Sequence, residues 1–114
     1  MKEERKRLGR LKRLEKIRAI AKQTAAVEAA QAESTLTQLR ALSERTRRMS
    51  SDYASRREAS DGAALHQLGR FVTGLQAIAR NTDGDALRAQ SIADAKQREL
   101  AAAERRRAAI EERA

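Results

Sequence analysis

The chain has 114 residues, of which 36% are charged and 2% aromatic, and it carries a formal net charge of +9. With so few large apolar residues it cannot fill a wide globular core, so we expect one narrow domain. The chain contains no cysteine, which excludes disulfides and thiolate metal sites. No apolar run approaches the roughly 18 to 20 residues of a membrane span. We therefore expect a cytosolic protein without membrane insertion.

Positive charge is concentrated at the start of the chain, where nine basic residues lie between Lys2 and Arg18 against three glutamates. Proteins that bind single-stranded nucleic acid stack the bases on aromatic side chains. Tyr53 and Phe71 are the only aromatic residues, and both lie far from this segment. Nucleic acid is therefore not an expected partner.

The first predicted element is a helix from about residue 3 to 58, because the chain lacks proline and is rich in strong helix formers. Its opening apolar residues step mostly by three, which makes an apolar face broader than one partner helix covers. They are Leu8, Leu11, Leu14, Ile17 and Ile20. This face is either an adjustment of the helix near its end or a second surface that another protein covers.

Two runs with alternating spacings of three and four predict a seam, the line along which two helices face each other. The first run is Leu11, Leu14, Arg18, Ala21, Ala25, Glu28, Ala32, Thr35, Leu39, Leu42, Thr46, Met49 and Tyr53. The second is Leu65, Leu68, Val72, Leu75, Ala79, Thr82, Ala86, Ala89, Ala93, Lys96, Leu100, Ala103, Arg107 and Ile110. A turn at about residues 59–62 pairs Tyr53 with Leu68, Met49 with Val72, and Leu42 with Ala79.

The second predicted helix runs from about residue 63 to 112. Residues 81–85 have the composition of a turn when they are considered alone. The heptad spacing of the seam nevertheless continues through them without interruption. A continuous helix and a three-helix arrangement both remain open. The continuous reading gives an all-α fold, in which the whole of residues 1–114 is one antiparallel coiled-coil hairpin of two long helices.

Enzymatic chemistry is not expected. His66 is the only histidine and has no cluster of metal ligands near it in the sequence, and no glycine-rich phosphate loop is present. A two-helix hairpin also offers no enclosed pocket that could shift the pKa of a carboxylate. We expect no catalytic, cofactor or metal site, and a function in contacts with other proteins.

Two stripes beside the seam are candidate contact surfaces, because a two-stranded coil buries only about two of every seven positions. On the second helix the stripe is Phe71, Leu75, Ile78 and Thr82. On the first helix it is Gln38, Leu42, Arg45 and Met49. The stripes either widen the packing of the hairpin or dock a partner, and Phe71 and Ile78 are expected to be largely exposed.

The segment LHQLGRFVTGLQAIA, from Leu65 to Ala79, resembles the FliJ family of the bacterial flagellar type III export apparatus. In that family a Phe followed by a branched aliphatic residue, then a Leu four residues after the Phe, lie on the second helix. The opening RLGRLKRLEKIR is similar to FliJ starts. The family folds as a two-helix antiparallel coiled coil that resembles the stalk of rotary ATPases.

The resemblance implies three partners: the flagellar export ATPase ring, the cytoplasmic domain of the export gate, and export chaperones. It implies that the two stripes face the gate and that the protein is peripheral at the cytoplasmic face of the flagellar base. The basic tip of the first helix is then expected to meet the ATPase ring. The basic tip comprises Arg5, Lys6, Arg7, Arg10, Lys12 and Arg13. The alternative is a generic coiled-coil scaffold or adaptor, or the stalk protein of a non-flagellar type III secretion system.

Overall fold

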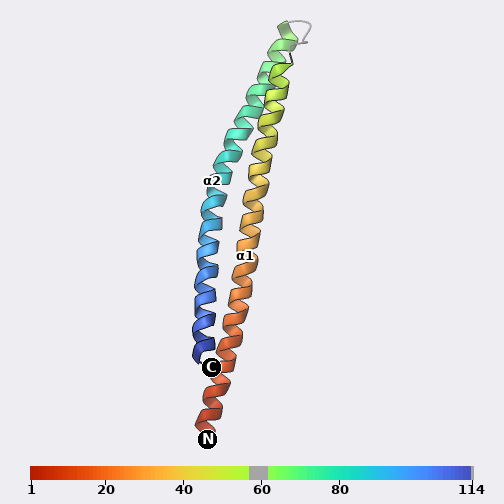
Figure 1. The fold of residues 1–114 in the computed structure, drawn as a ribbon. Coiled ribbons are helices and arrows are strands. Elements are labelled where there is room, and N and C mark those ends of the chain that lie inside the picture. The colour runs from red at the N-terminus through yellow and green to blue at the C-terminus, as the bar shows by residue number, and fades with distance from the viewer. Residues whose placement is uncertain (57–61, 114) are drawn as a thin grey trace. The chain divides into compact units, whose positions relative to one another are not determined.

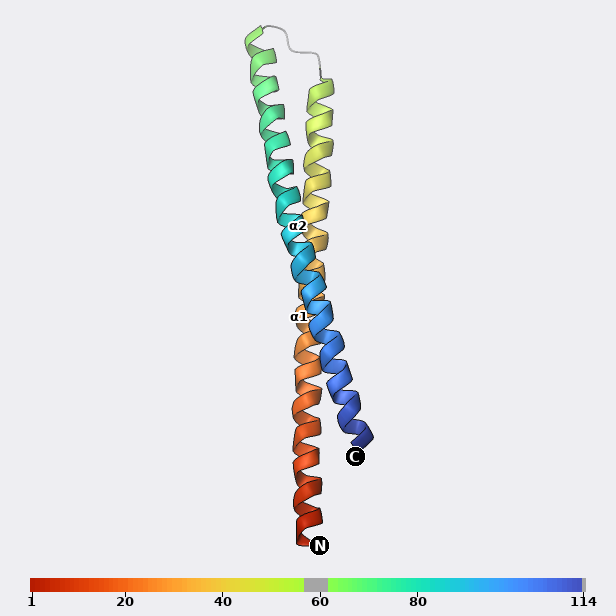
Figure 2. The same ribbon diagram turned by 90° about the vertical axis from the view of Figure 1, so that its left-hand side faces the viewer.

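A computed structural model describes residues 1–56 and 62–113, which form two long α-helices. Helix α1 spans Lys2–Ser55 and helix α2 spans Gly62–Arg113 (Figure 1). The chain divides into two compact units, each built from a segment of both helices. The first unit is Met1–Glu33 with Ser91–Ala114, and the second unit is Ser34–Gln90. The segments run antiparallel in each unit (Figure 2), which confirms the predicted all-α helical hairpin.

Helix α2 continues through Gly84 without a break, so the three-helix alternative is wrong. Residues 81–85 have weak helix propensity, but their side chains are held by partners. The Thr82 hydroxyl donates to the Ile78 carbonyl at 2.8 Å, and the Asp83 carboxylate accepts from Ser43 and Arg47 of α1. The contacts of Asp83 with α1 offset the local preference for a turn. The predicted helix end at 57–58 and the predicted turn positions 59–61 lie outside the described residues.

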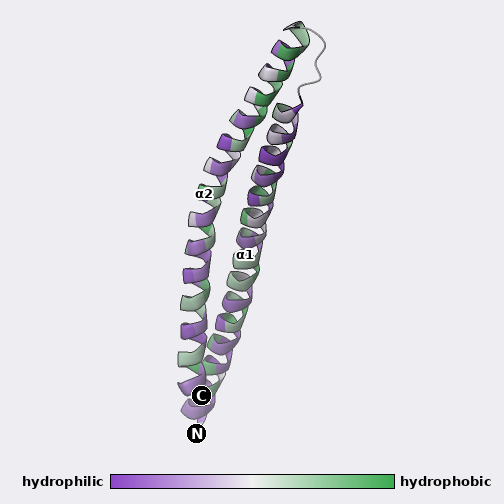
Figure 3. Ribbon diagram, turned by 45° about the horizontal axis from the view of Figure 1, so that its top comes forward, coloured by the Kyte–Doolittle hydropathy of each residue, from purple (hydrophilic) through white to green (hydrophobic). Residues whose placement is uncertain are grey.

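The seam of the second unit contains both small apolar and small polar side chains. Leu36, Ser43, Thr46 and Ser50 of α1 are buried, as are Leu75, Ala79, Thr82 and Ala89 of α2. Figure 3 shows hydrophobic residues along the side of α2 that is turned toward α1. The α2 positions from Leu68 onward follow the predicted second run, whereas Leu65 is exposed.

The predicted run on α1 is wrong in its phase. Leu14, Ala21, Thr35, Leu42 and Met49 are exposed, and the residues that follow them are half-buried or buried: Glu15, Lys22, Leu36, Ser43 and Ser50. From Leu11 the observed seam steps by four and then three, whereas the predicted run steps by three and then four. Both patterns are heptad repeats. The observed phase buries Leu36 to 2% exposure and leaves Leu42 at 41% exposure.

The register between the helices also differs from the predicted one, by about one helical turn. Tyr53 packs on Phe71 instead of Leu68, with ring centroids 4.9 Å apart. Lys96 Nζ lies 3.2 Å from Glu28 Oε2, whereas the predicted register places Ala93 opposite Glu28. The change of phase and the change of register go together, because an a position of one helix faces a d position of the other in an antiparallel pair.

In the first unit the seam is rich in alanine. Ala29, Ala93 and Ala103 are buried together with Ile110. Arg18 and Arg107 also lie at seam positions, and their Nε atoms are buried without a hydrogen bond to any described residue. Arg107 Nε has an ionic neighbour in Glu111 Oε1 at 3.3 Å. Seam cations that are incompletely paired stabilise less than apolar side chains of the same size, so this unit depends mainly on alanine packing.

We predict that Leu36→Ala lowers the free energy of unfolding by roughly 2 to 5 kcal/mol, because it empties a buried site. Leu42→Ala is a matched control on the same helix and should cost less than about 1 kcal/mol, because Leu42 is largely exposed. Urea denaturation followed by circular dichroism measures both. A larger loss of unfolding free energy in Leu42→Ala than in Leu36→Ala would instead support the predicted α1 phase, in which Leu42 lies in the seam.

Candidate interaction surfaces

The seam of the second unit separates two flanks with different chemistry. Residues that directly precede Ser43, Ser50, Val72 and Ala79 lie on one side of an antiparallel helix pair. Residues that directly follow Leu39, Thr46, Thr82 and Ala89 lie on the other side. The first side is here called the apolar flank, and it consists of Leu42, Met49, Phe71 and Ile78. The second side is the polar flank, and it consists of Arg40, Arg47, Asp83 and Gln90.

Large side chains of the apolar flank remain accessible. Phe71 is 47% exposed and Ile78 is 50% exposed, as predicted for both, and Leu42 and Met49 are exposed to a similar degree. The Phe71 ring packs edge-on against Tyr53 with an angle of 74° between the ring planes. The Arg56 guanidinium in turn lies 4.3 Å from the centre of the Tyr53 ring. Phe71 is thus held in place while much of its surface stays open.

Of the eight residues expected to face the export gate, six are exposed and two are buried. The exposed ones are Gln38, Leu42, Arg45, Met49, Phe71 and Ile78. Leu75 and Thr82 belong to the seam, where Thr82 also uses its hydroxyl to bond the Ile78 carbonyl. The structure therefore brings together the aliphatic residues of the two predicted stripes, and places Leu75 and Thr82 beneath them.

The polar flank carries hydrogen bonds and ion pairs between the helices. Arg40 donates to Gln90, and Arg47 pairs with Asp83, which also accepts a hydrogen bond from buried Ser43. The Ser43 hydrogen bond is the largest influence that lowers the pKa of the Asp83 carboxyl below its ordinary value of 3.8, and Arg47 lowers it further. Ser43 and Arg47 therefore stabilise the charged form of the Asp83 carboxylate.

The polar flank is absent from the sequence-based predictions, although the sequence contains a signal for it. Arg40 and Arg47 are seven residues apart, and so are Asp83 and Gln90. Paired polar residues at heptad spacing are typical of positions that flank a seam. The pairing becomes visible only with the observed register, because the predicted register does not bring these residues together.

The basic tip lies in the first unit, and all six of its predicted residues are exposed. None of the six forms an ion pair with another described residue. The end of α2 lies beside the start of α1, since a small pocket is lined by Glu4, Arg7, Leu8, Leu11 and Arg113. Ile17 and Ile20 are each 59% exposed on the same helix. Most of the broad apolar face is therefore open, while Leu11 belongs to the seam.

A second charge cluster lies in the seam of the first unit. Lys96 Nζ is 3.2 Å from Glu28 Oε2 and 3.4 Å from Glu99 Oε2. The hydrogen bond to Glu28, followed by that to Glu99, raises the pKa of Lys96 above its ordinary value of 10.5. This contact ties α1 to α2, so the cluster has a structural role.

Over residues 1–56 and 62–113, no group of three or more His, Cys, Asp or Glu side chains could hold a metal ion, and His66 is exposed. Neither α1 nor α2, over the residues described, is long and apolar enough to cross a membrane. Comparison of the chain with protein-family models, with curated proteins and with solved structures finds no match. The surfaces themselves are therefore the basis for a functional proposal.

We predict that Asp83→Asn destabilises the protein at neutral pH and that this effect shrinks in acid. A carboxyl with a lowered folded pKa contributes stability above its ordinary pKa of 3.8, and the contribution is lost as the pH falls through the folded value. Thermal unfolding of both proteins across the acid range measures this convergence. Asp85→Asn is the control, because Asp85 pairs with Arg88 of its own helix and forms no ion pair with a described residue of α1. A gap between Asp83→Asn and the parent that stays constant with pH would contradict the charged interaction.

Proposed function

We propose that the protein is a soluble coiled-coil component of the bacterial flagellar type III export apparatus. In this role it is a stalk-like cytoplasmic partner of the export ATPase ring, engages the export gate and handles export chaperones. The observation that carries the proposal is the apolar flank. Two stretches that the FliJ resemblance assigns to one partner lie on different helices, and their exposed aliphatic and aromatic residues fall on one side of the second unit.

The apolar flank has the properties of a docking site for a helix or a groove. Leu42 and Met49 come from α1, and Phe71 and Ile78 from α2, so a partner that covers them contacts both helices at once. Aromatic residues held in place by their neighbours lose little side-chain entropy on binding. Phe71 is therefore the expected hot spot of this surface. Leu75 supports this flank from the seam, since it is buried between the exposed residues.

The basic tip suits the proposed ATPase contact. Six exposed cations without ion pairs among the described residues present a positive end to a partner, and Arg113 of α2 lies beside them. A ring whose inner surface is acidic would attract this end over roughly one Debye length, about 8 Å at physiological salt. The apolar flank and the basic tip lie in different units, so the two contacts are separable by mutation.

We predict that Phe71→Ala weakens binding to the cytoplasmic domain of the export gate by about tenfold or more, the size expected of an interface hot spot. The loss of unfolding free energy should be near 1 kcal/mol, because only the edge contact with Tyr53 and partial burial are removed. Titration calorimetry and thermal unfolding on the same variant separate the two effects.

Leu87→Ala is the matched control for Phe71→Ala. Leu87 is 72% exposed on α2 in the same unit but lies off the apolar flank. Its removal should change neither gate binding nor export. Equal losses of gate affinity in Phe71→Ala and Leu87→Ala would contradict the proposed contact with the gate. Normal gate binding by a stable Phe71→Ala protein would contradict it as well.

We predict that reversing two charges of the basic tip, Arg10→Glu with Arg13→Glu, slows association with the export ATPase and reduces the dependence of the rate on salt. Stopped-flow association at several salt concentrations measures both quantities. Reversal of Arg105 and Arg106 is the control, because both are exposed arginines of the first unit outside the basic tip. Unchanged association after reversal of Arg10 and Arg13 would show that the basic tip is only a solvated helix end.

A further inference from the structure

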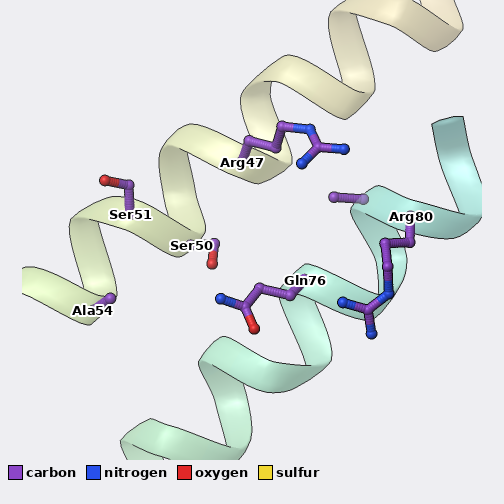
Figure 4. A pocket seen from close by; sticks show the side chains of 7 residues that line it. Arg47, Ser50, Ser51, Ala54, Gln76 and Arg80 are labelled. Atoms are coloured by element: carbon purple, nitrogen blue, oxygen red, sulfur yellow. The ribbon is translucent and has the colours of Figure 1, made fainter.

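A polar pocket of about 540 Å³ opens beside the polar flank, between α1 and α2 of the second unit. Arg47, Ser50 and Ser51 line it from α1, and Gln76 and Arg80 line it from α2 (Figure 4). We call it the arginine pocket. It lies across the seam from the apolar flank, since its α1 residues Arg47 and Ala54 follow the seam positions Thr46 and Tyr53. The proposed gate-binding surface therefore does not include it.

Ser50 differs from the other serine and threonine residues that are buried among the described residues. Four such side chains are buried: Ser43, Thr46, Ser50 and Thr82. Ser43 donates to Asp83, and Thr46 and Thr82 donate to the carbonyls of Leu42 and Ile78. Ser50 as a whole residue is only 6% exposed, and its hydroxyl forms no hydrogen bond with any described residue. Its Oγ atom is nevertheless open to solvent, because Arg18 Nε and Arg107 Nε are the buried side-chain atoms of the described residues that lack a hydrogen bond. The Ser50 hydroxyl points into the arginine pocket (Figure 4), where it can donate a hydrogen bond to a ligand.

The other groups around the arginine pocket are also hydrogen-bond donors. Arg47 is oriented by its ion pair with Asp83, while Arg80 forms no ion pair with any described residue. The Gln76 amide extends from α2 toward the side of the pocket where Ser50 lies (Figure 4). Because Asp83 offsets the charge of Arg47, the uncompensated charge of the pocket is that of Arg80. Guanidinium, amide and hydroxyl donors together match an acceptor that carries negative charge, such as a carboxylate.

We propose that the arginine pocket binds the carboxylate groups of an acidic segment of a partner polypeptide. A volume of about 540 Å³ exceeds what a single small anion fills, and it accommodates a short run of side chains. In this arrangement one carboxylate meets Arg80 and Gln76, and accepts a hydrogen bond from Ser50. The site is independent of the proposed export function, because it uses neither the apolar flank nor the basic tip.

The test uses the full chain and a fluorescein-labelled tetraglutamate peptide, with binding followed by fluorescence anisotropy at fixed salt. Arg80→Gln should weaken binding about tenfold, the loss expected for a hydrogen-bonded charge. Ser50→Ala should weaken it by a smaller factor while thermal unfolding stays near the parent, because the hydroxyl bonds no described residue. Arg70→Gln is the matched control, since it removes the same charge from an exposed position of α2 outside the arginine pocket.

Equal weakening by Arg70→Gln and Arg80→Gln would overturn the proposal, since it would mean that the peptide follows the overall positive charge of the chain. Displacement of the labelled peptide by inorganic phosphate, at the same concentration as by unlabelled tetraglutamate, would overturn it as well. The pocket would then be a general anion site rather than one for acidic polypeptides. An unaltered affinity in Ser50→Ala would remove the Ser50 hydroxyl from the site and contradict the proposed geometry.

Discussion

Packing of small side chains at the seam of the second unit is the constraint on which the other features of this unit depend. Ser43, Thr46 and Ser50 face α2, and the larger aliphatic residues Leu42 and Met49 stand one position before Ser43 and Ser50. Small side chains allow the helix axes to approach, and three of the four buried hydroxyl side chains in the described chain find partners across or along the helices. Since each of these hydroxyls avoids the cost of an unsatisfied buried polar group, the polar seam is compatible with a stable pair.

The heptad phase of α1 determines which residues are exposed on the two sides of the seam. Because Ser43 and Ser50 take the seam, Leu42 and Met49 turn outward and join Phe71 and Ile78. On the opposite side the same choice brings Arg47 to Asp83 and leaves Arg80 without a carboxylate among the described residues. One rotation of α1 about its axis thus creates both an apolar flank and a polar flank. A narrow helix pair can then recognise different chemistry on its two sides without a pocket buried in a globular core.

Much of the fold follows from the sequence alone, because its signals are local and repeated. Absence of proline, strong helix formers and heptad spacing predict two long helices, and the α2 seam follows the predicted run from Leu68 to Ile110. The α1 seam does not follow from the sequence, since Leu42 and Met49 favour one phase by size while Ser43 and Ser50 satisfy the same spacing. Choosing between them requires the contacts with α2. The exposure of Phe71 and Ile78 is predictable from the α2 seam, whereas the arginine pocket depends on the observed register.

The most direct measurement is an intramolecular disulfide test in the second unit, which is possible because the chain has no cysteine. Thr46→Cys combined with Ala79→Cys joins two buried seam positions that the observed register places opposite each other. Leu42→Cys combined with Ala79→Cys joins the pair that the alternative phase requires. We expect the first pair to form a disulfide within a monomer under mild oxidation and the second to remain reduced. A disulfide in the second pair and none in the first would contradict the seam, and with it the two flanks.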